Sequence, residues 1–418
     1  MHFITFLLKN LLRRKARTLL TILGIAVAVG TTISLLGVSD NFERETMHGL
    51  AGRGIDIVVL EKDVLDQLTS DLLENTGGEI TANIPEVDAT AVALIEIVAY
   101  KQEGTTLTLI FQGWNTDSFL LDGLTILEGR KLQEGDANQV ILGKIVADLI
   151  KKKPGDKMLV EGEEFEVVGI FESFTLQENR CLVANLPKMQ DMYFREGHVT
   201  GLSVRLKNKN ATKVEVQEIC DKINKLTKIT HQGDSELEVG TVVSKEHFEE
   251  LNKQLESEGK EPCKGDLLKL DAQPTSEYVN NSLHIRVAQS MAWMTSIIAV
   301  FVGAIGMLNT MVMSVVERVK EISILRAIGW KKIRIVKMIV GESVLLSIAG
   351  TIFGAIGSVV LIRLLVSLPQ VSGYLNSSIP WTAFAKGIGL ALIIGFVGGL
   401  YPAIRAAALM PSEGLRHE

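Results

Sequence analysis

The sequence lacks the short motifs that mark most catalytic and nucleotide-binding sites. It contains no G-x-x-x-x-G-K-[ST] loop, no H-E-x-x-H, no G-x-S-x-G and no C-x-x-C. The first of these motifs cradles phosphates with backbone N–H groups, so its absence excludes that mode of ATP binding. We therefore expect a chain that is not an enzyme and that binds no cofactor.

Cysteine is scarce as well, with Cys181, Cys220 and Cys263 the only three in 418 residues. An odd number leaves at least one thiol unpaired, and both a single disulfide and three free thiols fit the sequence. The cysteines and the seven histidines show no spacing typical of metal ligands, so we expect no metal.

Charged side chains are missing from four long stretches, although 22% of the whole chain is charged. A helix needs about 20 residues to cross the ~30 Å hydrocarbon core of a bilayer. Three runs reach that length and the fourth, flanked by Trp381 and Tyr401, is slightly shorter. We predict four transmembrane helices, at residues 18–39, 287–316, 343–362 and 387–404.

Lysine and arginine indicate the orientation in the membrane. The first 17 residues contain five basic residues and no acid, and residues 317–337 contain seven basic residues against two acids. Basic segments stay in the cytoplasm. We therefore expect a protein of the cytoplasmic (inner) membrane with both termini on the cytoplasmic side. The start of the chain is interpreted as an interfacial helix, although a cleaved signal peptide is the alternative. Its apolar face would contain Phe3, Phe6, Leu7 and Leu11.

Residues 40–285 have a different composition, with 26 basic residues against 44 acidic ones, and would lie outside. Strand-like segments occur at 55–60, 91–100, 105–114, 157–173 and 198–206, and helix-like segments at 138–152 and 211–226. Residues 231–275 are interpreted as loops or mobile helices. The predicted fold is an α-helical membrane protein with four transmembrane helices and a large α+β extracytoplasmic domain between helices 1 and 2. Its parts are residues 1–39, 40–285 and 286–418.

Small and polar residues inside two predicted spans suggest close helix packing. Span 2 contains Gly303, Gly306 and Asn309, and span 3 contains Gly350 and Gly354. Small residues let helices approach, and an asparagine can hydrogen-bond across a helix pair. Contact with a substrate is the alternative for Asn309. Because intramembrane charges are scarce, the spans do not resemble a water-filled channel.

The basic segment 317–337 is predicted to contain a short amphipathic helix that breaks near Gly329. Ile322, Leu325 and Ile328 recur at helical spacing. Such a helix can present one face to a soluble partner below the membrane. The alternative is that its charges only set topology and contact anionic lipid.

Four stretches together resemble the FtsX-like permeases of the MacB type, which are membrane subunits of ABC transporters. They are NLLRRKARTLLTILGIAVAVG (10–30), the segment 127–173, MLNTMVMSVVERVKEISILRAIGWKKIRIVKMIVGES (307–343) and GLYPAIRAAALMPSEGLRHE (399–418). The stretch 307–343 is the most specific, with a span ending in E-R followed by K-E-I-x-x-L-R-A-I-G. The match covers both ends and much of the middle of the chain.

The resemblance implies a mechanism and partners. Two permease subunits, identical or different, would sit on two copies of an ATP-binding subunit, and the helix within 317–337 would be the coupling helix. The residues implied to dock on the ATPase are Glu321, Ile322, Leu325, Arg326, Ala327, Ile328 and Gly329. Family members transmit motion to an external domain, which here would drive efflux or extraction of an envelope substrate.

The sequence has no ATP-binding domain, so we expect the ATPase to be a separate polypeptide. Other expected partners are the lipid membrane and an adaptor outside it, and no nucleic acid is expected. Two alternatives share this architecture: a signalling scaffold that activates a cell-wall hydrolase, as in cell-division FtsX proteins, and a lipoprotein-releasing permease. The shorter external domain of the scaffolds favours the exporter interpretation.

Overall fold

A computed structural model describes residues 15–64, 67–102, 105–174, 178–367 and 378–409. The proposed interfacial helix, with Phe3, Phe6, Leu7 and Leu11, lies outside the described residues, as does the end of the closing motif. The chain forms two compact units, residues 1–42 with 287–418, and residues 43–286. Each unit is considered separately below.

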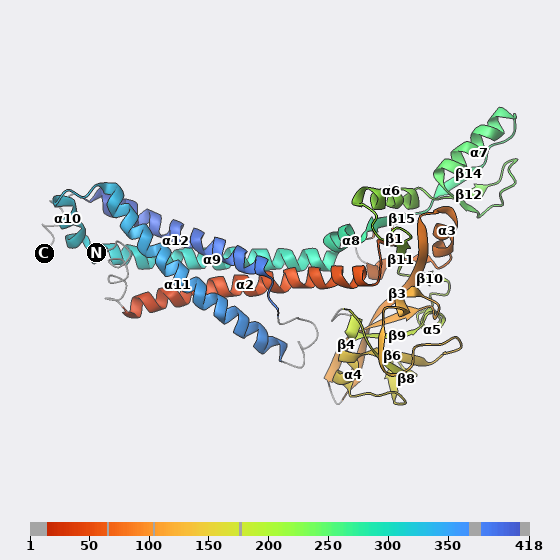
Figure 1. Ribbon diagram of the computed structural model, residues 1–418, viewed down its shortest axis with the longest axis horizontal. Helices are drawn as coiled ribbons and strands as arrows, with labels where there is room; N and C mark the ends of the chain where they lie inside the picture. Colours follow the sequence, from red (N-terminus) through yellow and green to blue (C-terminus); the bar gives the residue numbers. More distant parts are fainter. Residues whose placement is uncertain (1–14, 65–66, 103–104, 175–177, 368–377, 410–418) are drawn as a thin grey trace. The chain divides into compact units, whose positions relative to one another are not determined.

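Among the described residues, four helices are long and apolar enough to cross a membrane, as predicted. They are α2 (Lys15–Gly52), α9 (Leu283–Val316), α11 (Lys332–Val366) and α12 (Trp381–Ala408). Figure 1 shows them beside one another, with the short helix α10 (Val319–Ala327) at one end. Each helix is longer than the charge-free run predicted for it, because it also includes charged residues at its ends.

The short helix predicted within 317–337, with a break near Gly329, is α10, which covers only part of that range. Helix α10 ends at Ala327, and Gly329 adopts φ +97°, a backbone conformation that glycine adopts without steric cost. Lys331 is extended, and α11 begins at Lys332. The basic residues 332–337 therefore form the first turns of a membrane-spanning helix, and α10 is only nine residues long.

The outer unit is built on a mixed sheet in the order β15-β1-β11-β3-β4-β9-β6-β8-β5, with β7 paired to β8. Its strands are β1 (Ile57–Glu61), β3 (Val87–Gln102), β4 (Thr105–Trp114), β5 (Thr125–Gly129), β6 (Gln139–Gly143), β7 (Lys157–Val160), β8 (Glu163–Glu172), β9 (Cys181–Asn185), β11 (Gly201–Leu206) and β15 (Leu270–Pro274). A further pair joins β2 (Leu72–Leu73) to β10 (His198–Val199). The helices of this part are α3 (Thr76–Asn83), α4 (Lys144–Ile150), α5 (Leu186–Met192), α6 (Lys213–Asn224) and α8 (Thr275–Asn281).

Residues 227–267 form a small accessory module with its own core. Strands β12 (Thr227–His231), β13 (Val242–Val243) and β14 (Lys264–Leu267) pair antiparallel. Helix α7 (Lys245–Ser257) packs on them through Phe248, Leu251 and Leu255. Figure 1 shows α7, β12 and β14 grouped at the edge of the outer unit. The sequence interpretation of 231–275 as loops or mobile helices matches α7 but misses the strands β13, β14 and β15.

Apolar residues on both faces of the large sheet make the core of the outer unit. One cluster includes Phe111 and Phe165, whose rings meet edge to face with centroids 5.5 Å apart. The other includes Trp114 and Phe171. The predicted α+β domain between helices 1 and 2 is confirmed, because the chain between α2 and α9 contains both kinds of element.

Candidate coupling site and helix-packing sites

Helix α10 is joined to α9 by only two residues, Glu317 and Arg318. Arg17 of α2 donates from its two guanidinium nitrogens to the Glu317 carboxylate, at 2.9 and 2.5 Å. Arg318 Nη1 donates to both carboxylate oxygens of Glu342 in α11, at 2.8 and 2.9 Å, and its Nε donates to Glu321 at 3.2 Å. The start of α10 is therefore fixed to two other helices, α2 and α11, by ionised groups.

Ile322 points into the helix bundle and is only 1% exposed. It belongs to an apolar cluster against which Leu325 also packs. The sequence expectation that Ile322 is a docking residue is therefore wrong, because a residue without accessible surface cannot contact a partner. The other members of this cluster are Val315, Ile335, Met338, Ile339, Ala403, Ala406 and Ala407.

The opposite face of α10 is uncovered in this chain. Ile324 is 48% exposed and Ile328 is 73% exposed. Glu321, Ala327 and Gly329 are also exposed, whereas Arg326 is half-buried and donates to the Trp330 carbonyl at 3.0 Å. Of the seven residues expected to dock, the structure brings Glu321, Ala327 and Ile328 to this face, and Gly329 lies just beyond it.

Ile324 is a surface residue that the sequence reasoning missed. It lies four positions before Ile328, so both occupy one side of an α-helix. The spacing of Ile324 and Ile328 was visible in the sequence. The set Ile322, Leu325 and Ile328 fits helical spacing equally well, so the sequence did not single out Ile324. We use the name outer face of α10 for the exposed residues Lys320, Glu321, Ile324, Ala327 and Ile328.

The predicted packing glycines of α11 lie against α2. A methyl carbon added at Gly350 would lie 2.6 Å from Cγ2 of Ile25, and one at Gly354 would lie 2.7 Å from the Ala26 carbonyl oxygen. Such distances are shorter than real carbon contacts, so the two helices approach closely only because these side chains are absent. Gly357 has open space at the same position.

The predicted residues of α9 are divided between two environments. Gly303 faces Ala28 of α2, 3.2 Å from the position of an added methyl carbon, and Ile394 of α12 at 3.4 Å. Gly306 has nothing within 4 Å and Asn309 is exposed. Within this chain, the structure therefore places only Gly303 of the three at a helix contact.

Helix α12 contributes packing glycines that the sequence analysis did not single out. An added methyl carbon at Gly395 would lie 2.5 Å from the Ser347 hydroxyl, and one at Gly399 would overlap Ser343. The hydroxyls of Ser343 and Ser347 donate to carbonyl oxygens of their own helix, at 2.8 and 2.9 Å. Serine and glycine in register along α11 and α12 form the signal that could have identified this contact.

An ion pair also joins α2 to α12, near the start of α12. Lys386 donates to both carboxylate oxygens of Asp40, at 3.0 and 2.9 Å, and the Thr382 hydroxyl donates to the same carboxylate at 3.0 Å. This pairing explains how α12 begins at Trp381, before the predicted span at 387. The lysine that interrupts the apolar run is neutralised by its neighbour.

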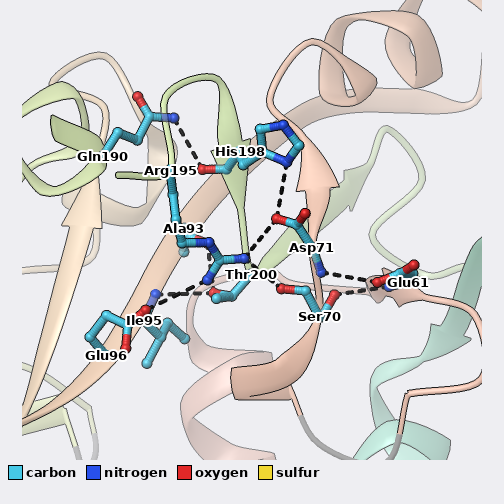
Figure 2. A network of polar contacts seen from close by, with 10 residues as sticks. All are labelled: Glu61, Ser70, Asp71, Ala93, Ile95, Glu96, Gln190, Arg195, His198 and Thr200. Atoms are coloured by element: carbon cyan, nitrogen blue, oxygen red, sulfur yellow. Dashed lines mark hydrogen bonds and ion pairs between the residues drawn. The ribbon is translucent and has the colours of Figure 1, made fainter. Parts of the chain in front are cut away.

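The outer unit contains a polar network around Arg195 (Figure 2). Arg195 donates to the Ser70 carbonyl at 2.9 Å and to Asp71 at 2.8 Å, and it lies 3.6 Å from Glu96. A ring nitrogen of His198 lies 3.0 Å from Asp71. Burial raises the pKa of Asp71, but hydrogen bonds from Arg195 and His198 outweigh it and leave the pKa below its ordinary value. The network holds the β2–β10 pair against β3.

Beside the network lies an open cavity of about 650 Å³ lined by both polar and apolar residues. Its walls include Glu74, Asn75, Gly78, Thr90, Asn115 and Asp117. Glu74 accepts hydrogen bonds from Gln190 at 2.9 Å and Asn115 at 3.3 Å. Among the described residues, no group of three or more His, Cys, Asp or Glu is placed to hold a metal.

All three cysteines are buried thiols, and no disulfide joins them. Burial raises the pKa of Cys181 to about 12, and burial likewise raises the pKa of Cys220 to about 12. The thiolate is the reactive form of cysteine, so these two groups are unreactive near neutral pH.

These observations define a class of protein, a four-helix membrane protein with an inserted α+β domain. Two family models match the chain, the MacB-like periplasmic core domain over residues 18–219 and the FtsX-like permease C-terminal domain over residues 293–411. The chain belongs to the MacB/FtsX-like family of ABC transporter permeases, and its inserted domain is extracytoplasmic.

Individual relatives are similar along nearly the whole chain. An uncharacterized ABC transporter permease of Methanocaldococcus jannaschii is 26% identical, over 99% of this chain and 98% of the relative. The macrolide export ATP-binding/permease protein MacB of Bdellovibrio bacteriovorus is 23% identical, over 98% of this chain but 61% of the relative. The solved periplasmic region of MacB from Actinobacillus actinomycetemcomitans aligns with a TM-score of 0.36 and 11% identity, over 57% of this chain and 98% of that one. The family assignment depends on the two family models.

Proposed function

We propose that this permease transmits the motion of a separate ATPase subunit to its outer unit, and so drives export or extraction of an envelope substrate. The observation that carries the proposal is the outer face of α10. It presents two isoleucines, 48% and 73% exposed, on a nine-residue helix clamped at its first turn. Exposed apolar side chains on a rigid element suit docking into a partner's groove.

The family of ABC transporter permeases implies a partner ATPase, which supports placing ATP hydrolysis on another polypeptide. On this proposal the permease itself is not catalytic.

Transmission of motion, rather than conduction, suits the interior of the helix bundle. The buried polar residues of α11 are small hydroxyls that donate within their own helix, together with Glu342, which is paired with Arg318. Glycines of α12 occupy the space beside them. A packed serine–glycine seam leaves little room for a hydrated path between α11 and α12.

We further propose that α10 and both termini face the cytoplasm, as the basic residues around α10 favour. A second permease subunit, identical or different, would cover the face of α9 that carries Gly306 and Asn309. That face otherwise leaves an amide exposed within an apolar helix, which is costly in lipid. An adaptor protein is a further proposed partner of the outer unit.

The proposal is tested by the double substitution Ile324→Asp and Ile328→Asp. Two carboxylates buried without partners in an apolar groove should cost several kcal/mol of binding. We expect ATPase co-purification to fall more than 100-fold and ATP hydrolysis to fall to the rate of the ATPase alone. Leu325→Asp is unsuitable because Leu325 packs against the internal cluster.

The matched control is Val214→Asp, since Val214 is a 68% exposed aliphatic residue of α6 in the outer unit. It should leave both ATPase binding and stimulation unchanged. Normal stimulation by the Ile324/Ile328 variant would contradict the docking assignment.

The signalling scaffold is the second candidate, because the FtsX-like model matches residues 293–411. The outer unit of residues 43–286 favours the transport function because scaffolds of this family are expected to have a short external domain. Lipoprotein release would use the same architecture. Proteins recovered with the outer unit distinguish these functions: a cell-wall hydrolase indicates a scaffold, a lipoprotein indicates release, and an adaptor indicates export.

A further inference from the structure

The connection between α9 and α10 consists entirely of two oppositely charged residues. Helix α9 ends at Val316 and α10 begins at Val319, so Glu317 and Arg318 are the whole elbow. The carboxylate of Glu317 is bound by Arg17 of α2, and the guanidinium of Arg318 is bound by Glu342 of α11. Adjacent residues thus attach one turn of backbone to two different helices.

The residue preferences of helix N-termini do not explain why an arginine occupies position 318. It is the N-cap residue, with φ −114°, and its side chain makes no capping hydrogen bond. Serine, threonine, aspartate or asparagine is favoured at an N-cap, and a cation is disfavoured there by the helix dipole. An arginine at this position therefore does not stabilise α10 itself, and its ion pair with Glu342 of α11 explains its presence.

The Arg318–Glu342 pair is almost completely buried. Their side chains are 11% and 4% exposed, and one guanidinium nitrogen lies 2.8 and 2.9 Å from the two carboxylate oxygens. A buried ion pair is weak evidence for stability, because apolar residues of similar volume often hold a protein together equally well. What an ion pair adds is a directional attachment that packing alone does not specify.

We propose that Glu317 and Arg318 form an ionic clasp that locks the elbow of α10 to α2 and α11, with Arg318 and Glu342 as its central positioning residues. The inference rests on the proposed docking of an ATPase on α10. A displacement of α10 then moves the elbow, and the two ion pairs pass the movement to both helices. Because α2 runs without a break from Lys15 to Gly52, five residues before β1, movement at Arg17 has a continuous path toward the outer unit.

The close contact of α2 with α11 reinforces the clasp. Gly350 and Gly354 bring α11 against Ile25 and Ala26, so the two helices held by the elbow also hold each other. The clasp is therefore a closed connection of α2, the elbow and α11. Loss of one ion pair would leave the elbow attached to a single helix, and so more mobile, without separating α2 from α11.

The test compares Arg318→Met/Glu342→Met with the reversed pair Arg318→Glu/Glu342→Arg. The methionine variant removes both charges and keeps apolar volume, so it should insert, keep or raise its melting temperature and bind the ATPase normally. We expect its stimulation of ATP hydrolysis to fall at least 10-fold, with much of the loss restored in the reversed pair. The ATPase is the subunit recovered with the wild-type chain from its native membrane. Lys157→Met/Glu164→Met removes an exposed pair of the outer unit and is the matched control.

A second readout needs no partner. Nitroxide labels at Leu20→Cys in α2 and Ala327→Cys in α10 report the spread of distances between the two helices, and the native cysteines are at most 3% exposed and unsuited to labelling. We expect a narrow distribution in the wild type and at least a twofold broader one in the methionine variant.

Normal stimulation together with an unchanged distribution in the methionine variant would overturn the clasp. A variant that binds the ATPase but does not stimulate it supports the clasp. Failure of the wild-type chain to recover or stimulate any ATPase would instead overturn the proposed function and, with it, the transmission role. The label distances would then still show whether the ion pairs hold the elbow.

Discussion

Individual carboxylates organise the chain at the scale of the residue. Asp136 in the outer unit accepts hydrogen bonds from two guanidinium nitrogens of Arg130, at 2.6 and 2.9 Å, and from the Gln133 amide at 2.8 Å. Its own carbonyl accepts from Asn185, at 3.3 Å, so one residue connects the β5–β6 loop to the end of β9. Hydrogen bonds from Arg130 hold the pKa of Asp136 below its usual value, although burial opposes them.

Substitution Asp136→Asn should therefore destabilise the outer unit by about 1–2 kcal/mol at pH 7. The lost bonds are charge-assisted, but Arg130 is partly exposed and its interaction is screened by water. The folded pKa is depressed, so the stabilisation is present above the unfolded value of 3.8 and is lost as pH falls through the folded value. The difference between wild type and variant should shrink below about pH 3.8.

Urea unfolding monitored by the fluorescence of Trp114 measures this difference, in a chain whose three other tryptophans are replaced by phenylalanine. Midpoints would be compared at pH 7 and pH 3. A difference of the same size at both values would show that the charge of Asp136 does not stabilise the fold. No difference at pH 7 would exclude the role altogether.

The sequence could not show which residues of α10 face outward. Apolar residues at 322, 324, 325 and 328 permit more than one face of a nine-residue helix to dock. The choice depends on α11 and α12, whose residues bury Ile322 and leave Ile324 outside. Those neighbours are distant in sequence, so spacing within α10 alone could not separate the inner from the outer face.

At the scale of the element, close approach of α2 and α11 depends on two glycines. The substitution Gly350→Val would place its β-carbon 2.6 Å from Ile25, so the helices must separate or their side chains must leave preferred rotamers. Overpacking of this kind costs about 1–3 kcal/mol. We expect Gly350→Val to lower the melting temperature of the chain in detergent by several degrees.

Gly357→Val provides the control in the same helix, since nothing lies within 4 Å of its added β-carbon. Its melting temperature should stay close to that of the wild type. Equal loss in both variants would mean that valine in α11, rather than contact with α2, causes the effect.

Elements were predicted well where their signals were local. The strand-like segment 157–173 is β7 and β8, joined by Glu161 and Gly162 at φ 49° and 90°, as a two-residue hairpin requires. The helix predicted over 138–152 is instead β6 followed by α4, because the short apolar run before Lys144 suits either structure. The run forms a strand because it pairs with β8 and β9, which are distant in the sequence.

At the scale of the whole molecule, the four spans and the inserted domain could be predicted because a bilayer imposes length and charge limits on each helix. The glycine–serine contacts between α11 and α12 could not, since they require knowing which helices are neighbours. Docking on the outer face of α10, the ionic clasp and the uninterrupted α2 together make an account of how force would travel through the chain.

The most direct measurement places a photoreactive benzoylphenylalanine at Ile324 and irradiates native membranes. The account predicts a cross-link to an ABC ATPase subunit, identified by mass spectrometry, and no such cross-link from the same residue placed at Val214. A cross-link from Ile324 to another permease or an extracytoplasmic protein, with none to an ATPase, would contradict docking on the outer face of α10.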